Sequence, residues 1–173
     1  MLSDISNIHN NVDLIYITTA VIIIDLIVIL IAKNTTFFGK QINVWYDKFG
    51  MTAVFLDVTI IIIGLIITRY ICSVYSLTFN PLYFILIALA VQLVHDSLLY
   101  KLIIEPTSYG INKVIDVYKD YAIENGAKIL LADSAMVLGS ALLAMYLKNN
   151  EMHLTITMLV IALYIIPYLI FQY

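Results

Sequence analysis

The stretch LIALAVQLVHDSLLYKLII, residues 86 to 104, decides the class of fold. A helix needs about 20 mainly apolar residues to cross the hydrocarbon core of a bilayer, and this stretch has that length. Three polar side chains nevertheless lie near its middle, at Gln92, His95 and Asp96. A charge at that depth is costly unless it is compensated, so the stretch predicts a membrane-spanning helix with a polar centre.

The composition of the whole chain agrees with this interpretation. Of the 173 residues, 62% are hydrophobic and 12% are charged, which is about half the charged fraction of a typical soluble domain. The single cysteine, Cys72, excludes an internal disulfide, a CxxC redox pair and a cysteine-rich zinc site. Six glycines and three prolines leave no room for a flexible linker, so we expect one domain over residues 1–173 without internal repeats.

Five segments have the length and apolar character of spanning helices. The predicted fold is therefore an all-α membrane helix bundle, with the lipid bilayer as its surroundings. The polar N-terminus lacks the basic residues of a cleaved signal peptide, so the first span is expected to remain as an anchor. The five predicted spans are residues 14–32, 51–71, 82–104, 127–147 and 154–172.

Two connections between the spans are long enough to carry structure of their own. Residues 33–50 are interpreted as a polar loop that ends in aromatic residues suited to the membrane interface. Residues 111–125 place apolar side chains on one helical face and charged ones on the other, which predicts an amphipathic helix ending before Gly126. That helix is expected on the membrane surface or against the bundle, and an ordinary surface helix explains the pattern equally well.

The basic residues predict the orientation of the bundle. With five spans, the first and third connections lie on the same side of the membrane, and the positive-inside rule assigns the lysine-rich side to the cytosol. We therefore expect the N-terminus outside or in a lumen and the C-terminus in the cytosol. The opposite side holds only Arg69 and Lys148, against seven residues on the predicted cytosolic side: Lys33, Lys40, Lys48, Lys101, Lys113, Lys119 and Lys128.

Four of the five predicted spans carry one acidic residue each: Asp25, Asp57, Asp96 and Asp133. At a rise of about 1.5 Å per residue, all four lie roughly 9–12 Å from the cytosolic ends of their helices. Four ionised carboxylates cannot share a dry layer, so some must be protonated, paired, bound to a cation or open to water. Ionisable groups inside a membrane are functional candidates by default, although hydrogen-bonded contacts between helices explain such residues equally simply.

Within the third span, helical spacing places Gln92, Asp96 and Tyr100 on one face, with His95 beside them. Because adjacent residues do not face each other on a helix, we expect His95 and Asp96 to meet only through tertiary geometry. The candidate catalytic residues are Asp57, His95, Asp96 and Asp133. The wider predicted polar layer comprises Asp25, Asp57, Gln92, His95, Asp96, Tyr100, Asp133 and Ser134.

Known catalytic motifs are missing from the chain. There is no GxSxG serine elbow, no HExxH motif and no glycine-rich phosphate loop. The other two histidines, His9 and His153, lie on the opposite side from the acids. We therefore expect no metal, no cofactor and no nucleic acid, although a zinc ion or other cation held by His95 with two aspartates is a weaker alternative.

Two stretches carry a resemblance: WYDKFGMTAVFLDVTIIIIG at 45–64 and GINKVIDVYKDYAIENGAKILLADSAM at 110–136. They resemble uncharacterised small polytopic membrane proteins encoded by large nucleocytoplasmic DNA viruses, and the likeness covers roughly residues 45 to 147. That family has no assigned activity. The resemblance implies only a setting, which is the internal membrane of a virion or a host membrane used in assembly. Asp57 and Asp133 fall inside the matching stretches.

Three functions follow as hypotheses. The first is a structural or assembly component of a viral membrane, which would contact copies of itself or other membrane and capsid proteins. The second is a proton- or cation-conducting protein whose acid layer forms a half-channel. The third is a small membrane-embedded enzyme that acts on a lipid, with a buried carboxyl as general acid or base. A cavity that reaches the acids would favour the second and third hypotheses over the first.

Overall fold

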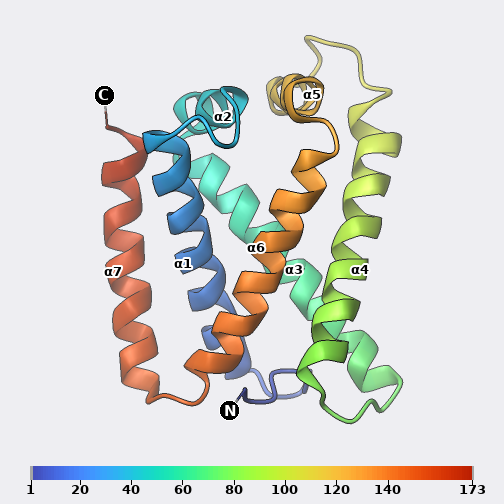
Figure 1. Cartoon of the computed structure of the whole chain (residues 1–173), viewed down its shortest axis with the longest axis vertical. Helices are drawn as coiled ribbons and strands as arrows, with labels where there is room; N and C mark the ends of the chain where they lie inside the picture. Colours follow the sequence, from blue (N-terminus) through green and yellow to red (C-terminus); the bar gives the residue numbers. More distant parts are fainter. Residues whose placement is uncertain (1, 173) are drawn as a thin grey trace.

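The computed structural model describes residues 2–172 and confirms an all-α bundle with five helices long and apolar enough to span a membrane (Figure 1). The predicted spans differ from the observed ones by only a few residues at each end, as is usual for helix boundaries. The third span includes a short π-helical turn, η1. The elements in chain order are α1(Asp13–Asn34), α2(Gln41–Phe49), α3(Met51–Val74), α4(Pro81–Leu99), η1(Tyr100–Ile104), α5(Lys113–Asn125), α6(Lys128–Leu147) and α7(Met152–Ile170).

Helix α1 lies between α7 and α6 (Figure 1) and also packs against α3. Because it is apolar on every face, it is suited to this buried position. Gly139 of α6 helps α1 and α6 to approach each other, since a Cβ at this position would lie 3.1 Å from Ile24 Cδ1. At one edge of the bundle α4 packs against α6 and α3, and at the opposite edge α7 packs mainly on α1.

The connection between the first two spans contains a helix, which corrects the prediction of a loop over residues 33–50. In α2, Ile42, Trp45, Tyr46 and Phe49 recur at the three- and four-residue intervals of one helical face. Trp45 and Tyr46 are buried, and their burial against the bundle explains why so short a segment is helical. The aromatic residues expected at a membrane interface therefore pack inside the protein.

The predicted amphipathic helix over 111–125 is present as α5, beginning at Lys113. Its N-terminus is capped by Asn112, whose Oδ1 accepts the N–H of Val114 at 2.8 Å. Helix α5 packs mainly on α2, so part of its apolar face meets the protein and not lipid. Helices α2 and α5 both lie across the same end of the bundle (Figure 1). We call this the pocket end, for the cavity described below.

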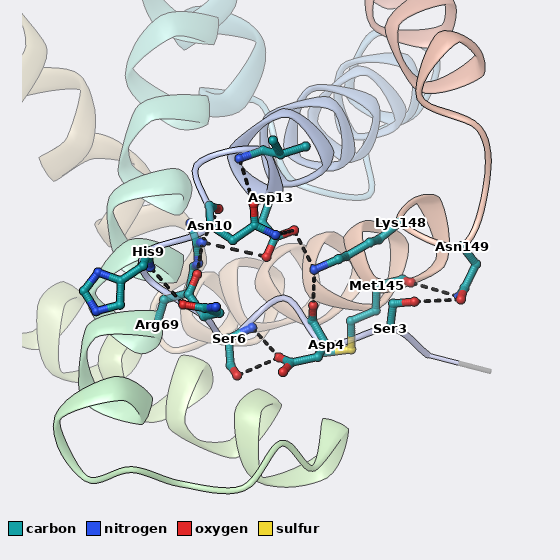
Figure 2. Close-up of polar contacts among 12 residues, drawn as sticks. Ser3, Asp4, Ser6, His9, Asn10, Asp13, Arg69, Met145, Lys148 and Asn149 are labelled. Carbon is teal, nitrogen blue, oxygen red and sulfur yellow. Dashed lines mark hydrogen bonds and ion pairs between the residues drawn. The ribbon is translucent and has the colours of Figure 1, made fainter.

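The opposite end of the bundle, which we call the sealed end, carries the N-terminal segment and the connections α3–α4 and α6–α7 (Figure 1). Its centre is the buried carboxylate of Asp13 (Figure 2). Lys148 Nζ lies 2.6 Å from Asp13 Oδ1, and Arg69 Nη2 lies 3.9 Å from Asp13 Oδ2. The Arg69 guanidinium also donates to the backbone carbonyls of Asn7 and Asn10.

The N-terminal segment, residues 2–12, is fastened over this end (Figure 2). The Ser3 N–H donates to the Met145 carbonyl at 3.2 Å, and Ser3 Oγ donates to Asn149 Oδ1 at 2.7 Å. The side chain of Ile5 is fully buried in the core. This polar segment, to which the sequence assigned no structural role, therefore closes one end of the bundle.

Candidate functional site

A cavity of about 800 Å³ lies at the pocket end, between α2, α3, α4, α5 and α6. This volume is within the usual range for a small-molecule site, about 300–1,000 Å³. Most of the wall is apolar, and it includes Leu56, Ile60, Val117, Leu130 and Met136. An apolar cavity with a few polar groups is the common form of a ligand site, so the polar groups decide what it can hold.

Three of the four predicted acids line this pocket. Asp57 comes from α3, Asp96 from α4 and Asp133 from α6. The structure thus brings together residues 37 or more positions apart in the chain, since 57 to 96 is 39 and 96 to 133 is 37. The remaining polar residues of the third span, Gln92, His95 and Tyr100, line the same pocket.

Asp96 is the centre of a small hydrogen-bonded group on α4. Its Oδ1 accepts the Gln92 side-chain amide at 2.8 Å and lies 3.0 Å from His95 Nδ1. The adjacent pair therefore meets within one helix, which corrects the expectation that His95 and Asp96 would interact only through tertiary geometry. Asp96 Oδ2 is buried and has no partner among the described residues. When Nδ1 donates to Asp96, His95 Nε2 remains an acceptor that can serve as a general base.

The other two acids of the pocket differ in their hydrogen-bond partners. Asp57 Oδ2 accepts the indole N–H of Trp45 at 2.9 Å, which ties α2 to α3. Asp133 has no hydrogen-bond or ion-pair partner within residues 2–172, and it interacts electrostatically with Asp96 and Asp57. Within the described residues the carboxyl group of Asp133 therefore has no donor, and Asp57 has donors only from α2.

Two members of the predicted polar layer do not line the pocket. Asp25 is fully buried in α1, and neither of its carboxyl oxygens has a partner among the described residues. It lies close enough to Asp57 for the two carboxyl groups to interact, so it sits behind the pocket wall. Ser134 is next to Asp133 in the sequence but outside the lining, because successive residues of a helix point about 100° apart.

Aromatic side chains from α2 and α5 line the pocket on the side of the membrane surface, and the sequence analysis did not identify them as site residues. The rings of Trp45 and Tyr118 are 4.8 Å apart between centroids, and Tyr121 lies on the same helix as Tyr118. Burial, together with the carboxylates of Asp57 and Asp133, raises the pKa of Tyr118 and Tyr121 above the ordinary tyrosine value. Their hydroxyls thus stay protonated and can donate hydrogen bonds. For Tyr118 the available signal was its place on the predicted apolar face of residues 111–125. For Trp45 it was the three- and four-residue spacing of apolar residues in a segment predicted as a loop.

The π-helical turn η1 continues α4 along the pocket wall. Tyr100, Lys101 and Ile104 of this turn line the cavity. The Lys101 ammonium is bound by Glu105, at 2.9 Å, and is exposed to solvent. Among the lining residues of the described chain Lys101 is the one lysine or arginine, so the protein does not neutralise its own acids here. Irregular helical turns of this kind are often found at functional sites.

A bound zinc ion or other cation was the weaker alternative for the acids. Within residues 2–172 no group of three or more histidine, cysteine, aspartate or glutamate side chains is placed to hold a metal ion. Comparisons with known proteins return no match to this chain, whether to a family model, a curated protein or a solved structure. The function of the pocket therefore has to come from its own geometry.

Proposed function

We propose that this membrane protein binds a lipid-like molecule with a positively charged head group in the pocket beneath α2 and α5. The observation that carries the proposal is the cavity of about 800 Å³, whose apolar wall is interrupted by the carboxyl groups of Asp57, Asp96 and Asp133. An apolar tail fits the wall, and a cationic head fits the acids.

The charge of the site favours a cationic head over a neutral or acidic one. Carboxylates that share an apolar cavity repel one another and lose hydration, so each must be protonated or matched by positive charge. Asp133 receives nothing from the protein, and Asp96 is bonded only by residues of its own helix. An ammonium group brings both the charge and the hydrogen-bond donors that these oxygens lack.

Conduction of cations through the bundle fits the structure less well. A path from the pocket to the other side would have to pass the sealed end, where Arg69 and Lys148 flank Asp13. These two cations are held by a buried carboxylate and would repel a second cation. A purely structural role for the acids also fits less well, because such contacts should join different helices. Among the three pocket acids only Asp57 does so, through Trp45 and Tyr46 of α2.

The location of the protein forms the second part of the proposal. The resemblance to viral membrane proteins favours a virion or host assembly membrane, where self-association or contact with other membrane and capsid proteins would add a structural role. The orientation gains support from the sealed end, since Arg69 and Lys148 are both engaged with Asp13 there. All the other lysines lie towards the pocket end, so we expect this end in the cytosol. Protease digestion of a chain tagged at both ends should release only the C-terminal tag from the cytosolic side.

Binding can be measured with the protein's own fluorescence. The chain has a single tryptophan, and that residue, Trp45, lines the pocket. Protein reconstituted in lipid nanodiscs would be titrated with hexadecylamine, with hexadecanol as the neutral match and butylamine as a head group without a tail. We expect a saturable change in emission with hexadecylamine, at least about tenfold weaker binding of hexadecanol, and no saturation with butylamine.

Variants separate the pocket from general effects. Asp133→Asn should weaken binding of hexadecylamine by on the order of tenfold, because the amide keeps the shape but loses the charge. Asp120→Asn is the matched control, since Asp120 does not line the pocket and the amide oxygen can still accept the Tyr109 hydroxyl. If no amphiphile gives a saturable change, the proposed function is wrong. If hexadecanol binds as tightly as hexadecylamine, the pocket takes a lipid but the charge preference is wrong.

A further inference from the structure

Helix α5 covers the pocket but is held to the bundle by few contacts. Val117 is its one buried residue within the described chain. Five of its residues line the cavity: Val114, Val117, Tyr118, Tyr121 and Ala122. An element with little buried apolar surface opens at low free-energy cost, so α5 is the least firmly attached part of the wall.

The strongest polar tie between α5 and the rest of the protein is the carboxylate of Glu124. Its Oε1 accepts the backbone N–H of Lys40, and its Oε2 accepts that of Gln41, each at 2.8 Å. These donors lie at the N-terminus of α2, where backbone N–H groups have no partner within the helix. A side chain at the end of α5 thus caps a different helix, and these two bonds lower the pKa of Glu124.

Gly39 makes this contact geometrically feasible. A Cβ added at Gly39 would lie 2.7 Å from Glu124 Oε2 and 2.8 Å from Glu124 Cδ, closer than side chains pack. The φ angle of Gly39 is +82°, which also favours glycine. Any side chain at this position would push the Glu124 carboxylate off the N-terminus of α2.

Glycines also flank α5 at both ends. Gly110 precedes the helix with φ +86°, and Gly126 follows it with φ +53°. A Cβ at either position would meet no atom within 4 Å, so neither glycine is required by close packing. Both therefore act at the backbone, where a few residues that absorb changes in φ and ψ are typical of hinges.

Helix α2, by contrast, is anchored to the spans. Lys33 of α1 pairs with Asp47, and the Asn43 side-chain amide donates to the Ala32 carbonyl at 2.9 Å. Trp45 adds its bond to Asp57 of α3. When the contacts between α2 and α5 break, α5 is therefore the partner that is free to move.

We propose that α5 is a lid over the pocket, and that the Glu124 carboxylate is the latch that holds it shut against α2. Displacing α5 removes the Tyr118 and Tyr121 side of the wall and opens the cavity towards the membrane surface. The lid regulates access to the site assigned above. What passes beneath it rests on the proposed function, whereas the opening motion does not.

Opening can be measured without any ligand. In a Cys72→Ser background, Ala132→Cys places a single thiol in the pocket wall on α6. The rate at which a water-soluble maleimide labels this thiol in nanodisc-embedded protein reports how often the lid opens. Glu124→Gln removes the charge and one of the two acceptor oxygens, and should raise the rate by on the order of tenfold. Asp120→Asn, which removes a charge from the same helix but keeps an acceptor for the Tyr109 hydroxyl, should leave the rate unchanged.

A second perturbation tests the latch from the other side. Gly39→Ala should raise the labelling rate in the parent, because its Cβ displaces the Glu124 carboxylate. In a Glu124→Ala background the same substitution should add much less, since only the backbone strain at φ +82° remains and there is no carboxylate left to displace. Additive effects of the two substitutions would overturn the latch, even if one variant folds poorly.

The labelling and binding experiments can overturn the lid and the proposed function independently of each other. Equal labelling rates for the parent and Glu124→Gln, with hexadecylamine still binding, would overturn the lid alone. Faster labelling of Glu124→Gln, with no amphiphile binding to the parent, would support the lid and overturn the proposed function. Faster labelling together with faster entry of hexadecylamine supports both.

Discussion

The two ends of the bundle differ in whether a buried carboxyl group is paired with positive charge. At the sealed end, Asp13 is fully buried between the cations of Arg69 and Lys148. At the pocket end, Asp133 faces a cavity and has no partner within residues 2–172. A paired charge fastens three parts of the chain together, whereas an unpaired one leaves free energy available for a ligand.

The supply of positive charge does not explain this difference. The pocket end has seven lysines, but none binds the acids of the cavity. Lys33 pairs with the exposed carboxylate of Asp47, and Lys101 pairs with Glu105. The sealed end has only two basic residues, and both reach Asp13. The acids of the pocket are uncompensated because of where the chain directs its side chains, not because cations are scarce.

The largest expected loss of stability follows from a substitution at the sealed end. Asp13→Asn removes the charge that holds Arg69 and Lys148, and leaves the buried guanidinium of Arg69 without a counter-ion. Removing one partner of a buried ion pair costs about 3–5 kcal/mol, so we expect a loss of that order in the free energy of unfolding. Denaturation of the purified protein in detergent, followed by circular dichroism, measures it. A loss below about 1 kcal/mol would mean that the network does not fasten this end.

Replacing an aspartate by asparagine at the pocket end should not lower the free energy of unfolding. Asp133→Asn removes a carboxylate that repels Asp57 and Asp96 and has no partner of its own. We expect the free energy of unfolding to stay unchanged or to rise by up to about 1 kcal/mol. The same denaturation measurement applies, in the absence of any ligand. A strong destabilisation would place Asp133 with the structural residues and remove the contrast between the two ends.

The smallest effect concerns the response of the lid to pH. The N–H groups of Lys40 and Gln41 hold the pKa of Glu124 below its ordinary value, and the Lys40 ammonium acts in the same direction. The latch is therefore fully formed above the ordinary glutamate pKa, 4.5, and is lost only as the pH falls through the lower value of the closed state.

This prediction is measured as a ratio of labelling rates. For the pocket thiol and dithiodipyridine, which reacts in acid, the rate of Glu124→Gln over that of the parent should be constant from about pH 8 to 5 and approach one below about pH 4. A transition in this ratio well above about pH 5 would show that a group other than Glu124 controls the opening.

The secondary structure of the spans was predictable because a bilayer leaves few alternatives. Long apolar runs must form helices that satisfy their own backbone hydrogen bonds, and this holds whatever the helices pack against. The common depth of the acids stays a prediction from the rise along a helix, and the structure shows that three of them line one pocket. Helix α2 was missed because its helicity depends on burying Trp45 and Tyr46 against the bundle.

The partners of each charged group were not predictable from the sequence. Asp25 and Asp57 have the same predicted depth, yet only Asp57 reaches the pocket, since its direction depends on how α3 is rotated against its neighbours. Arg69 and Lys148 were counted as basic residues of one side, and nothing in the sequence joined them to Asp13. Glu124 was placed on the polar face of an amphipathic helix, with no sign that it would cap another helix.

The sequence by itself determined the class of protein: five apolar helices in a membrane, a layer of acids at one depth and a lysine-rich side. Length, composition and periodicity are enough for this, because they act on each segment separately. Only the tertiary structure decided that one end is sealed and the other hollow. Those features depend on the rotation and contact of helices from distant parts of the chain, and local patterns do not encode which side chains meet.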